Sequence, residues 1–215
     1  MLCKEVGVQL IYVWEDDYLL NKEILIRMIR NKLGVSNEDK INARDCNICT
    51  VSYSLAKEFL DKNHIQGGVT GSEYLSLVDK YNNIVALMVL QEDGNLLNLK
   101  RYATSCNVRG GFSKLLKYTG ETYNYDGIYT FSDNGVSDGS LYSSNGFSID
   151  KVIKPDYSYV IGGIRKHKFN YRLKRFKEDK DLFYKEGLSE KELAYANGLL
   201  RVWDAGKLRW IKMFR

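Results

Sequence analysis

Residues 107–116, NVRGGFSKLL, place an asparagine, an arginine and two adjacent glycines directly before a run that can start a helix. Backbone N–H groups are exposed at a glycine-lined helix N-terminus, and the aligned peptide dipoles add positive potential there. Phosphate groups bind well to such a terminus. The segment therefore predicts a loop that can hold the phosphates of a nucleotide-like cofactor. The candidate cofactor-binding residues are Asn107, Arg109, Gly110, Gly111, Ser113 and Lys114.

The elements around this loop predict a mixed α/β fold. The strand-like segment LLNLKRYAT (residues 96–104) leads into the loop, and further strand-like runs lie on both sides of it in the sequence. Helical patterns fall between strands at two or three points, including SLAKEFLDKNH at residues 54–64. We therefore expect a mixed β-sheet with flanking helices and with the loop and its helix near the centre.

The N-terminal segment predicts a strand followed by a helix. VQLIYVW (residues 8–14) is a short apolar run rich in β-branched and aromatic residues. Three acids follow at residues 15–17, where a helix N-terminus favours negative charge. Residues 18–34 then carry apolar side chains at helical spacing and end at Gly34. A polar stretch after Gly34 indicates a boundary near residues 34–42.

Positive charge is concentrated at the C-terminal end. Residues 165–215 contain 15 Lys and Arg against 7 Asp and Glu, a net charge of +8, whereas the first 164 residues carry 17 against 20. Such a distribution favours a polyanionic partner, with nucleic acid the first candidate, although a solvated tail gives the same composition. The candidate nucleic-acid-binding residues are Arg165, Lys166, Lys168, Arg172, Lys174, Arg175 and Lys177.

The spacing within this tail predicts local structure. Phe169, Leu173 and Phe176 are spaced as one apolar helix face, and a stripe of Lys168, Arg172 and Arg175 lies beside it. Ser189 and Glu192 form a capping box for a helix that ends at Gly198. Residues 199–210, LLRVWDAGKLRW, read as two strands around an Ala-Gly turn, with Trp203 and Trp210 packing the hairpin together.

The cysteines and the apolar runs exclude some classes of protein. Cys46 and Cys49 have the spacing of half a zinc site, but Cys3, Cys106 and the two histidines offer no matching second half, so we expect buried thiols and no metal. No apolar run reaches the roughly 20 residues of a membrane helix. The N-terminus lacks the pattern of a signal peptide. These features predict reduced thiols and a location in the cytoplasm, away from membranes.

Three stretches in order resemble the GNAT acyltransferase superfamily, over roughly residues 44–160. They are the strand LLNLKRYAT, the loop and helix VRGGFSKLLKY, and the segment SDGSLYSSNGF, in which a helix carries a tyrosine and ends at a Gly-Phe pair. The resemblance implies a GNAT-like sheet, with acetyl-CoA as the cofactor that the loop would hold. It also implies that Tyr142 acts as general acid toward the leaving thiolate. The alternative for Tyr142 is a helix tyrosine that packs against Phe147.

A narrower resemblance covers nearly the whole chain. YVWEDDYLLNKEI, FLDKNHIQG, GGFSKLLKY, SDGSLYSSNGF and RVWDAGKLRW are similar to bacteriophage proteins related to homing endonucleases. This implies that the N-terminal segment is the tail of a nuclease domain whose metal-binding part is missing, that the tail contacts DNA, and that the protein works in the host cell cytoplasm. The expected division is 1–40 as the nuclease remnant, 41–164 as the GNAT-like domain and 165–215 as a small basic α/β extension.

The loop departs from the superfamily pattern at two positions. Asn107 stands where Gln or Arg is usual, and Phe112 stands where a small residue is usual, whereas Gly110 fits. The Phe112 ring could block the approach of a pyrophosphate to the backbone, or it could pack inward in a tight turn. Three residues are candidates by type for the general base, namely Glu73, Asp133 and His64.

Three functions follow as hypotheses. The leading one is a phage-type GNAT-like protein that binds nucleic acid, with no nuclease and no efficient acetyltransferase activity. The second is an acetyl-CoA-dependent N-acyltransferase, and the third is a phage protein that inhibits a host protein by binding it. Weak or absent acetyl-CoA binding is the expectation that separates the first from the second.

Overall fold

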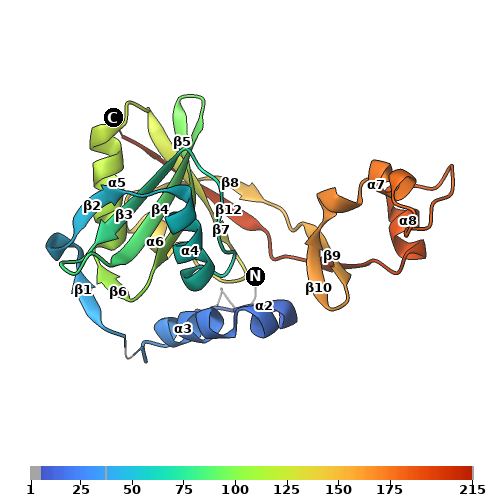
Figure 1. Cartoon of the computed structure of the whole chain (residues 1–215), viewed down its shortest axis with the longest axis horizontal. Helices are drawn as coiled ribbons and strands as arrows, with labels where there is room; N and C mark the ends of the chain where they lie inside the picture. The colour runs from blue at the N-terminus through green and yellow to red at the C-terminus, as the bar shows by residue number, and fades with distance from the viewer. Residues whose placement is uncertain (1–5, 37, 215) are drawn as a thin grey trace.

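The fold is built around a seven-stranded mixed sheet, seen in a computed structural model that describes residues 6–36 and 38–214 (Figure 1). Strands β5 and β7 run parallel, and the other neighbouring pairs of this sheet are antiparallel. The expected mixed sheet with flanking helices is confirmed. In spatial order the strands are β2 (Asn47–Thr50), β3 (Glu73–Val78), β4 (Ile84–Asp93), β5 (Leu96–Thr104), β7 (Gly127–Asp133), β12 (Lys207–Met213) and β8 (Ser148–Ile153).

Helices α4 (Tyr53–Asn63) and α5 (Gly111–Thr122) cover opposite faces of this sheet. Six consecutive residues of β4, from 85 to 90, are buried, as expected for a central strand with both faces covered. Alternate members of this run pack against different helices. Leu87 and Val89 contact the α4 side, whereas Met88 and Leu90 contact the α5 side. Short helix α6 (Ser140–Ser143) lies beyond β7 on the chain.

The parallel pair β5–β7 is short, and this opens the sheet. The two strands pair only where residues 96–98 face residues 127–129, after which they diverge. The Thr130 hydroxyl donates to the Leu99 carbonyl at 2.9 Å, just past the last pair. The register between β4 and β5 also shifts, because Leu90 faces Leu99 while Val89 faces Arg101. Lys100 is therefore the extra residue of a β-bulge, which changes the faces on which the following side chains lie.

Beyond this bulge, the side chains of β5 divide between the two layers. Tyr102 packs with Phe112 on the α5 side, and Ala103 packs with the α4 cluster. Arg101 therefore lies on the α4 side, at the part of β5 that no longer pairs with β7.

The N-terminal segment forms two helices, α2 (Glu15–Leu20) and α3 (Lys22–Lys32), and the chain breaks between them at Asn21 with φ of −132°. The acids at residues 15–17 form the first turn of α2, and Gly34 has the left-handed φ of +70°, as predicted. The predicted strand at residues 8–14 is wrong. This segment runs beside the loop after β7, where the Tyr12 N–H donates to the Gly135 carbonyl at 2.7 Å, and it finds no strand edge for a ladder.

A small lobe lies between β8 and β12 in the sequence and stands to one side of the main body (Figure 1). Its antiparallel sheet has the order β10-β9-β11, and its core contains Tyr159, Phe176, Leu193, Ala194 and Leu199. The boundary expected at residue 165 falls within the hairpin of β9 and β10. The elements of the lobe are β9 (Tyr157–Ile161), β10 (Ile164–His167), η2 (Lys168–Tyr171), α7 (Leu173–Glu178), α8 (Glu190–Ala196) and β11 (Leu200–Trp203).

The predicted hairpin at residues 199–210 is wrong, because its two strands belong to different sheets. Strand β11 pairs with β9 in the lobe, whereas β12 inserts between β7 and β8 in the main sheet. Trp203 therefore packs on Tyr157, while Trp210 lies in the main core. The capping box of Ser189 and Glu192 is confirmed at the start of α8.

The predicted helix with apolar and basic stripes is also wrong. The chain forms the 3-10 turn η2, becomes extended at Arg172 with ψ of 161°, and then starts α7. Phe176 is buried as expected, but Phe169 is 62% exposed. Because Arg172 interrupts the helix, Lys168 and Arg175 do not share a helical face with it.

Gly139 provides a test of this packing. Its φ is +80°, and a Cβ there would lie 2.1 Å from the Trp210 indole, whereas Gly163 has nearly the same φ of +79° with open space around it. We expect both Gly139→Ala and Gly163→Ala to cost the roughly 1–2 kcal/mol of a left-handed alanine. Gly139→Ala should cost about 1–3 kcal/mol more, because the methyl group overpacks the core. Urea unfolding of the two variants measures the difference, and equal losses would contradict the described position of Trp210.

Candidate active site

The predicted phosphate loop lies between β6 (Asn107–Arg109) and α5, and β6 pairs in parallel with β1 (Lys40–Asn42), which the turn η1 (Ala43–Asp45) follows. Gly110 is the N-cap residue of α5 and has the left-handed φ of +72°. No side chain caps this helix, and the Ser113 hydroxyl donates to the Gly110 carbonyl at 3.1 Å. The N–H groups of the first turn have no intrahelical acceptors, so they remain available to an anion.

Two of the predicted loop residues have other tasks. The Lys114 ammonium donates to the Ala43 carbonyl at 2.9 Å and to the Cys46 carbonyl at 2.6 Å, so two of its three N–H groups are already used. The Asn107 N–H donates to the Asp39 carbonyl at 3.2 Å. Arg109 is exposed beside them.

The loop backbone fits a phosphate group. A Cβ at Gly110 would meet nothing closer than the Ser113 Oγ at 3.8 Å, so the backbone there is open. Gly111 is required by packing, because a Cβ would lie 2.7 Å from the Tyr102 hydroxyl. A pyrophosphate of acetyl-CoA would therefore be held by the N–H groups at the start of α5, with Ser113 and Arg109 beside it.

The Phe112 ring is turned inward and is 4% exposed. It meets Tyr102 edge-to-face with ring centroids 5.1 Å apart, and Tyr142 with centroids 5.9 Å apart. Of the two alternatives for this residue, the inward packing is the one observed. The ring does not cover the loop backbone, but it fills the space between the loop and Tyr142.

A cavity of about 1010 Å³ lies where β5 and β7 diverge. Its walls come from residues 98–104 of β5, the end of β7, the C-terminal end of α4, Tyr142 of α6, and helices α2 and α3. Of the predicted proton donor and the six predicted cofactor-binding residues, Tyr142 is part of this lining and the six loop residues are not. The rings of Tyr102, Phe112 and Tyr142 thus separate the loop from the cavity.

Tyr142 can hold a proton in this cavity. Burial raises the pKa of its hydroxyl, and a hydrogen bond with the Thr130 side chain opposes that rise. The hydroxyl is protonated at neutral pH, because the pKa lies above the ordinary value near 10. The predicted alternative role also holds structurally, since Tyr142 packs against Phe147 with centroids 5.7 Å apart. Packing orients the ring, and Tyr142 still belongs to the lining of the cavity.

Two of the three candidate bases line the cavity. Asp133 lies at the end of β7, where its Oδ1 accepts the Gly135 N–H at 2.8 Å. His64 lies at the end of α4, where burial and then the charge of Arg101 lower its pKa to about 4. Glu73 lies outside the lining and accepts the Tyr123 hydroxyl at 3.2 Å. Asp133 is therefore the carboxylate placed to take a proton inside the cavity.

Sequence reasoning missed an ion-pair cluster at the edge of the cavity. Arg165 donates from Nε to Asp16 at 2.8 Å and contacts Asp17 through Nη2 at 2.7 Å, and its guanidinium lies 4.9 Å from the Trp14 ring centroid. Burial raises the pKa of the Asp16 carboxyl, but the hydrogen bonds and charge of Arg165 outweigh this, and the net shift is downward. For Asp17 burial prevails and the pKa is raised.

Most of the predicted nucleic-acid-binding cations have acidic partners. Lys168 contacts Asp156, Arg172 contacts Glu190 and Arg175 contacts Asp179, in addition to the Arg165 cluster. Lys174 lies 3.8 Å from Glu178 and is 81% exposed. Lys177 lies over the Tyr184 ring, and Lys166 is exposed on β10. The structure therefore places this set together on the lobe, with much of its charge neutralised.

The described cysteines are unpaired. Cys46 is buried as expected, but Cys49 is exposed, because it follows Ile48 on edge strand β2 and points to the opposite side. Cys3 lies outside the described residues.

Within residues 6–36 and 38–214, no group of three His, Cys, Asp or Glu is arranged to hold a metal ion. No described helix is long and apolar enough to cross a membrane.

Comparison with known proteins gives similarity of fold at low identity. No family model and no curated protein sequence matches the chain. The ribosomal-protein-S18-alanine N-acetyltransferase of Escherichia coli is 10% identical, with a TM-score of 0.46 over 79% of this chain and 94% of that chain. The spermidine/spermine N-acetyltransferase of Vibrio cholerae is 11% identical, with a TM-score of 0.46 over 80% and 94%.

An acetyltransferase of Bacillus subtilis, solved in complex with CoA, is 12% identical, with a TM-score of 0.42 over 78% of this chain and 98% of that chain. At these identities and scores the similarity assigns neither a substrate nor an activity to the chain. Any function has to be argued from the cavity and the loop themselves.

The lowered pKa of His64 predicts a pH dependence of stability. Between pH 6.5 and about 4 the unfolded chain binds a proton at this position that the folded chain does not, so stability falls as pH falls through that window. His64→Gln should remove up to about 3 kcal/mol of this loss, as chemical denaturation at a series of pH values would show. His167→Gln, which keeps His64, is the control. An unchanged slope in His64→Gln would contradict the burial of this imidazole.

Proposed function

We propose that the chain is an acyl-CoA-dependent N-acyltransferase whose acceptor amine enters the cavity between β5 and β7. The observation that carries the proposal is that Tyr142 lines this cavity, while the uncapped start of α5 lies on the other side of the Phe112 ring that packs against Tyr142. A binding cavity with a few convergent polar groups is where catalysis is expected on physical grounds.

The residues of the cavity provide the proton chemistry for amide formation. An acyl-CoA supplies the acyl group as a thioester, so that a C–N bond forms as the C–S bond breaks. The Asp133 carboxylate accepts the proton that the amine nitrogen loses. The Tyr142 hydroxyl donates a proton to the departing sulfur, and the raised pKa of this phenol keeps the proton in place until then.

The aromatic cluster of Tyr102, Phe112 and Tyr142 limits this function. A chain bound by its phosphates at the start of α5 reaches Tyr142 only if the Phe112 ring gives way, because that ring fills the intervening space. Displacing a buried ring consumes binding free energy. The proposal therefore includes weak acyl-CoA binding by the wild-type protein.

Calorimetry with acetyl-CoA tests the proposal. Phe112→Ala should bind at least about tenfold more tightly than the wild type, which corresponds to about 1.4 kcal/mol, because the obstacle is removed. Phe147→Ala is the matched control, since this ring belongs to the same cluster and is also buried, yet it does not stand between the loop and Tyr142. Phe112→Leu replaces Phe112→Ala in this experiment if the alanine variant does not fold.

Measurement of turnover is the second test. Tyr142→Phe should lower kcat by about 10²-fold or more without changing acetyl-CoA affinity. No acetyl-CoA binding by any of these folded variants would refute the proposal.

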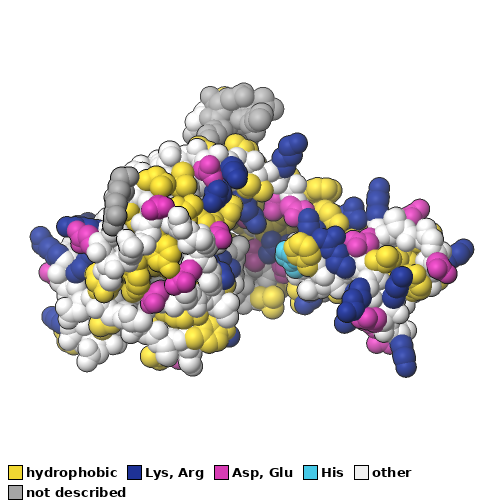
Figure 2. Space-filling model, turned by 90° about the horizontal axis from the view of Figure 1, so that it is seen from above, with side chains coloured by type: hydrophobic (Ala, Val, Ile, Leu, Met, Phe, Trp, Pro, Cys, Tyr) yellow, Lys and Arg dark blue, Asp and Glu magenta, His cyan; other side chains and the backbone are white. Residues whose placement is uncertain are grey.

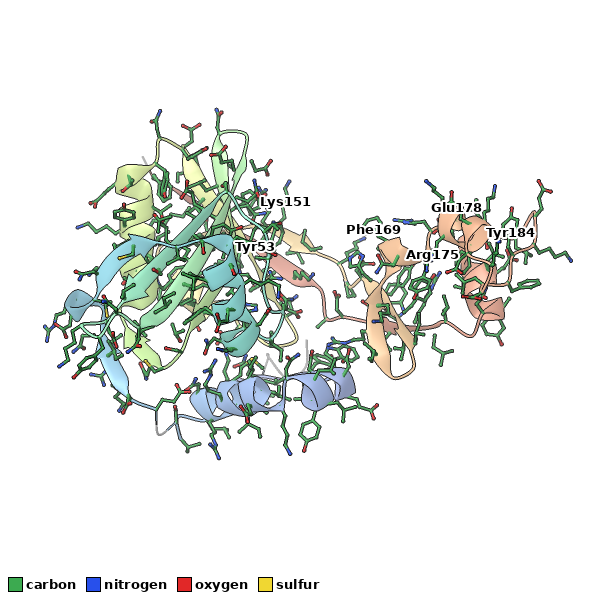
Figure 3. All side chains as sticks on the ribbon, in the orientation of Figure 1. Tyr53, Lys151, Phe169, Arg175, Glu178 and Tyr184 are labelled. Atoms are coloured by element: carbon green, nitrogen blue, oxygen red, sulfur yellow. The ribbon has the colours of Figure 1, made fainter. Side chains whose placement is uncertain are left out.

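Nucleic-acid binding by the small lobe is a second candidate function, and one observation favours it. Phe169 is 62% exposed, stacks on His167 with ring centroids 5.0 Å apart, and has the Arg172 guanidinium 4.6 Å from its centroid (Figure 3). Figure 2 shows hydrophobic, basic and histidine side chains side by side on the lobe. Exposed rings beside cations can stack on unpaired bases, so single strands are the favoured partner.

Fluorescence anisotropy with single-stranded DNA, single-stranded RNA and duplex DNA at two salt concentrations tests this second function. Phe169→Ala should weaken single-strand binding by about tenfold, since one base stack contributes about 1–3 kcal/mol. Phe183→Ala removes another exposed ring of the lobe, 51% exposed, and should have little effect. Lack of binding to every probe at low salt would eliminate nucleic acid as a partner of the lobe.

A further inference from the structure

Arg101 is a partly buried cation that no described carboxylate of the protein neutralises. Its Nη1 donates to the Lys100 carbonyl at 2.8 Å, and its buried Nε has no hydrogen-bond partner. Among residues 6–36 and 38–214, no carboxylate lies within ion-pair distance of Arg101, whereas the partly buried Arg27, Arg165 and Arg209 each have at least one. Leaving a guanidinium without an anion in such a site is costly. Arg101 lines the cavity, so a ligand can supply the missing anion.

His64 adds a second donor beside Arg101. Its Nδ1 accepts the Gln66 N–H at 3.1 Å, so the proton of the neutral imidazole lies on Nε2. Burial and the charge of Arg101 hold the pKa of this imidazole near 4, so the ring is neutral at pH 7. Both side chains thus offer N–H groups at one wall of the cavity. A group rich in acceptor oxygens satisfies both of them.

The opposite charge lies on the other strand. Asp133 stands at the end of β7, and Arg101 stands on the diverging part of β5, so the two lie on separate walls of the cavity. Asp17 also lines the cavity, but it is paired with Arg165. Lys100 and Lys207 increase the positive charge of the lining. A polycationic amine would face this excess of cations, whereas a ligand with one amine and one anionic group matches both walls.

We propose that the acceptor is an amine that also carries an anionic group, a carboxylate or a phosphate, and that Arg101 binds this group with His64 as the second donor. The inference rests on the proposed acyltransferase function only in treating the ligand of this cavity as the acceptor. The anion site itself is a property of Arg101 and His64. A planar guanidinium pairs with carboxylate and with phosphate through two parallel hydrogen bonds, so the geometry selects anionic oxygen and leaves open which of the two groups carries it.

Binding without any acyl-CoA is the first test. The chain has two histidines, so NMR of the imidazole ring can follow His64, with His64→Gln for assignment. Titration with L-glutamate and with glucosamine 6-phosphate separates the carboxylate from the phosphate, and spermidine is the cationic comparison. At least one anionic amine should shift the His64 signals and raise its pKa above about 4, because an anion beside Arg101 offsets the charge that now lowers it. Spermidine should leave the His64 signals unchanged.

Substitution of the guanidinium is the second test. Arg101→Gln should weaken binding of the preferred anionic amine by about tenfold or more, as expected for the loss of a charge-assisted pair. Arg101→Lys keeps the positive charge but loses the planar guanidinium. Its affinity for the anionic amine should therefore lie between the affinities of the wild type and of Arg101→Gln. Arg44→Gln is the control, because that side chain is 83% exposed and lies outside the cavity lining. Thermal unfolding establishes that each variant is folded.

The outcomes distinguish this inference from the proposed function. Unchanged affinity in Arg101→Gln, tighter binding of spermidine than of both anionic amines, or no binding of either anion would overturn the anion site. Anionic amines that bind through Arg101 support the site even where acetyl-CoA fails to bind, which would count against the transferase alone. Acetyl transfer to spermidine in preference to both anionic amines would support the acyltransferase function and contradict the assignment of an anionic acceptor.

Discussion

The limited pairing of β5 with β7 is the constraint on which the site depends. Their three paired residues hold the two halves of the sheet together, and the divergence that follows creates both the cavity and an unpaired edge of β5. On its other edge β7 is paired along its whole length with β12, so β7 stays part of the sheet where it diverges from β5. Strand β12 in turn lies between β7 and β8 and brings Trp210 against Tyr142. The C-terminal strand thus fixes the wall that carries the proposed proton donor.

A conflict between packing and cofactor access is built into the start of α5. Gly110 and Gly111 leave the helix terminus open to a phosphate, yet the next residue fills the interior behind it with a phenyl ring. Edge-to-face contacts with Tyr102 and Tyr142 stabilise the closed arrangement by about 0.5–1.5 kcal/mol each beyond the burial of area. In the proposed function, passage of an acyl-CoA from the loop to Tyr142 therefore depends on the Phe112 ring and not on the loop backbone.

The sequence predicted what local pattern controls and missed what depends on long-range pairing. The α5 terminus, the acidic start of α2 and the capping box of α8 follow from residue types at short spacing, and the structure contains all three. Short-range spacing does not determine which strands pair with β11 and β12. An Ala-Gly turn between two strand-like runs is compatible with a hairpin and also with a chain that crosses from one sheet to another. Arg101 was not predicted as a site residue for a similar reason. The bulge at Lys100 sets the face on which it lies, and that bulge arises from the register with β4.

The net charge of the tail is also an incomplete guide to binding, because it omits ion pairs formed in the folded protein. A net charge of +8 over residues 165–215 suggests a surface for polyanions, but the sum ignores acids that come from outside the segment. Asp16 and Asp17 of α2 bind Arg165, and Asp156 binds Lys168. The Arg165 contacts tie the hairpin of β9 and β10 to α2, whose neighbour α3 lines the cavity. Arg165 therefore links the small lobe to the wall of the candidate active site, and Arg101 is the cation that the fold leaves for a ligand among the described arginines of that wall.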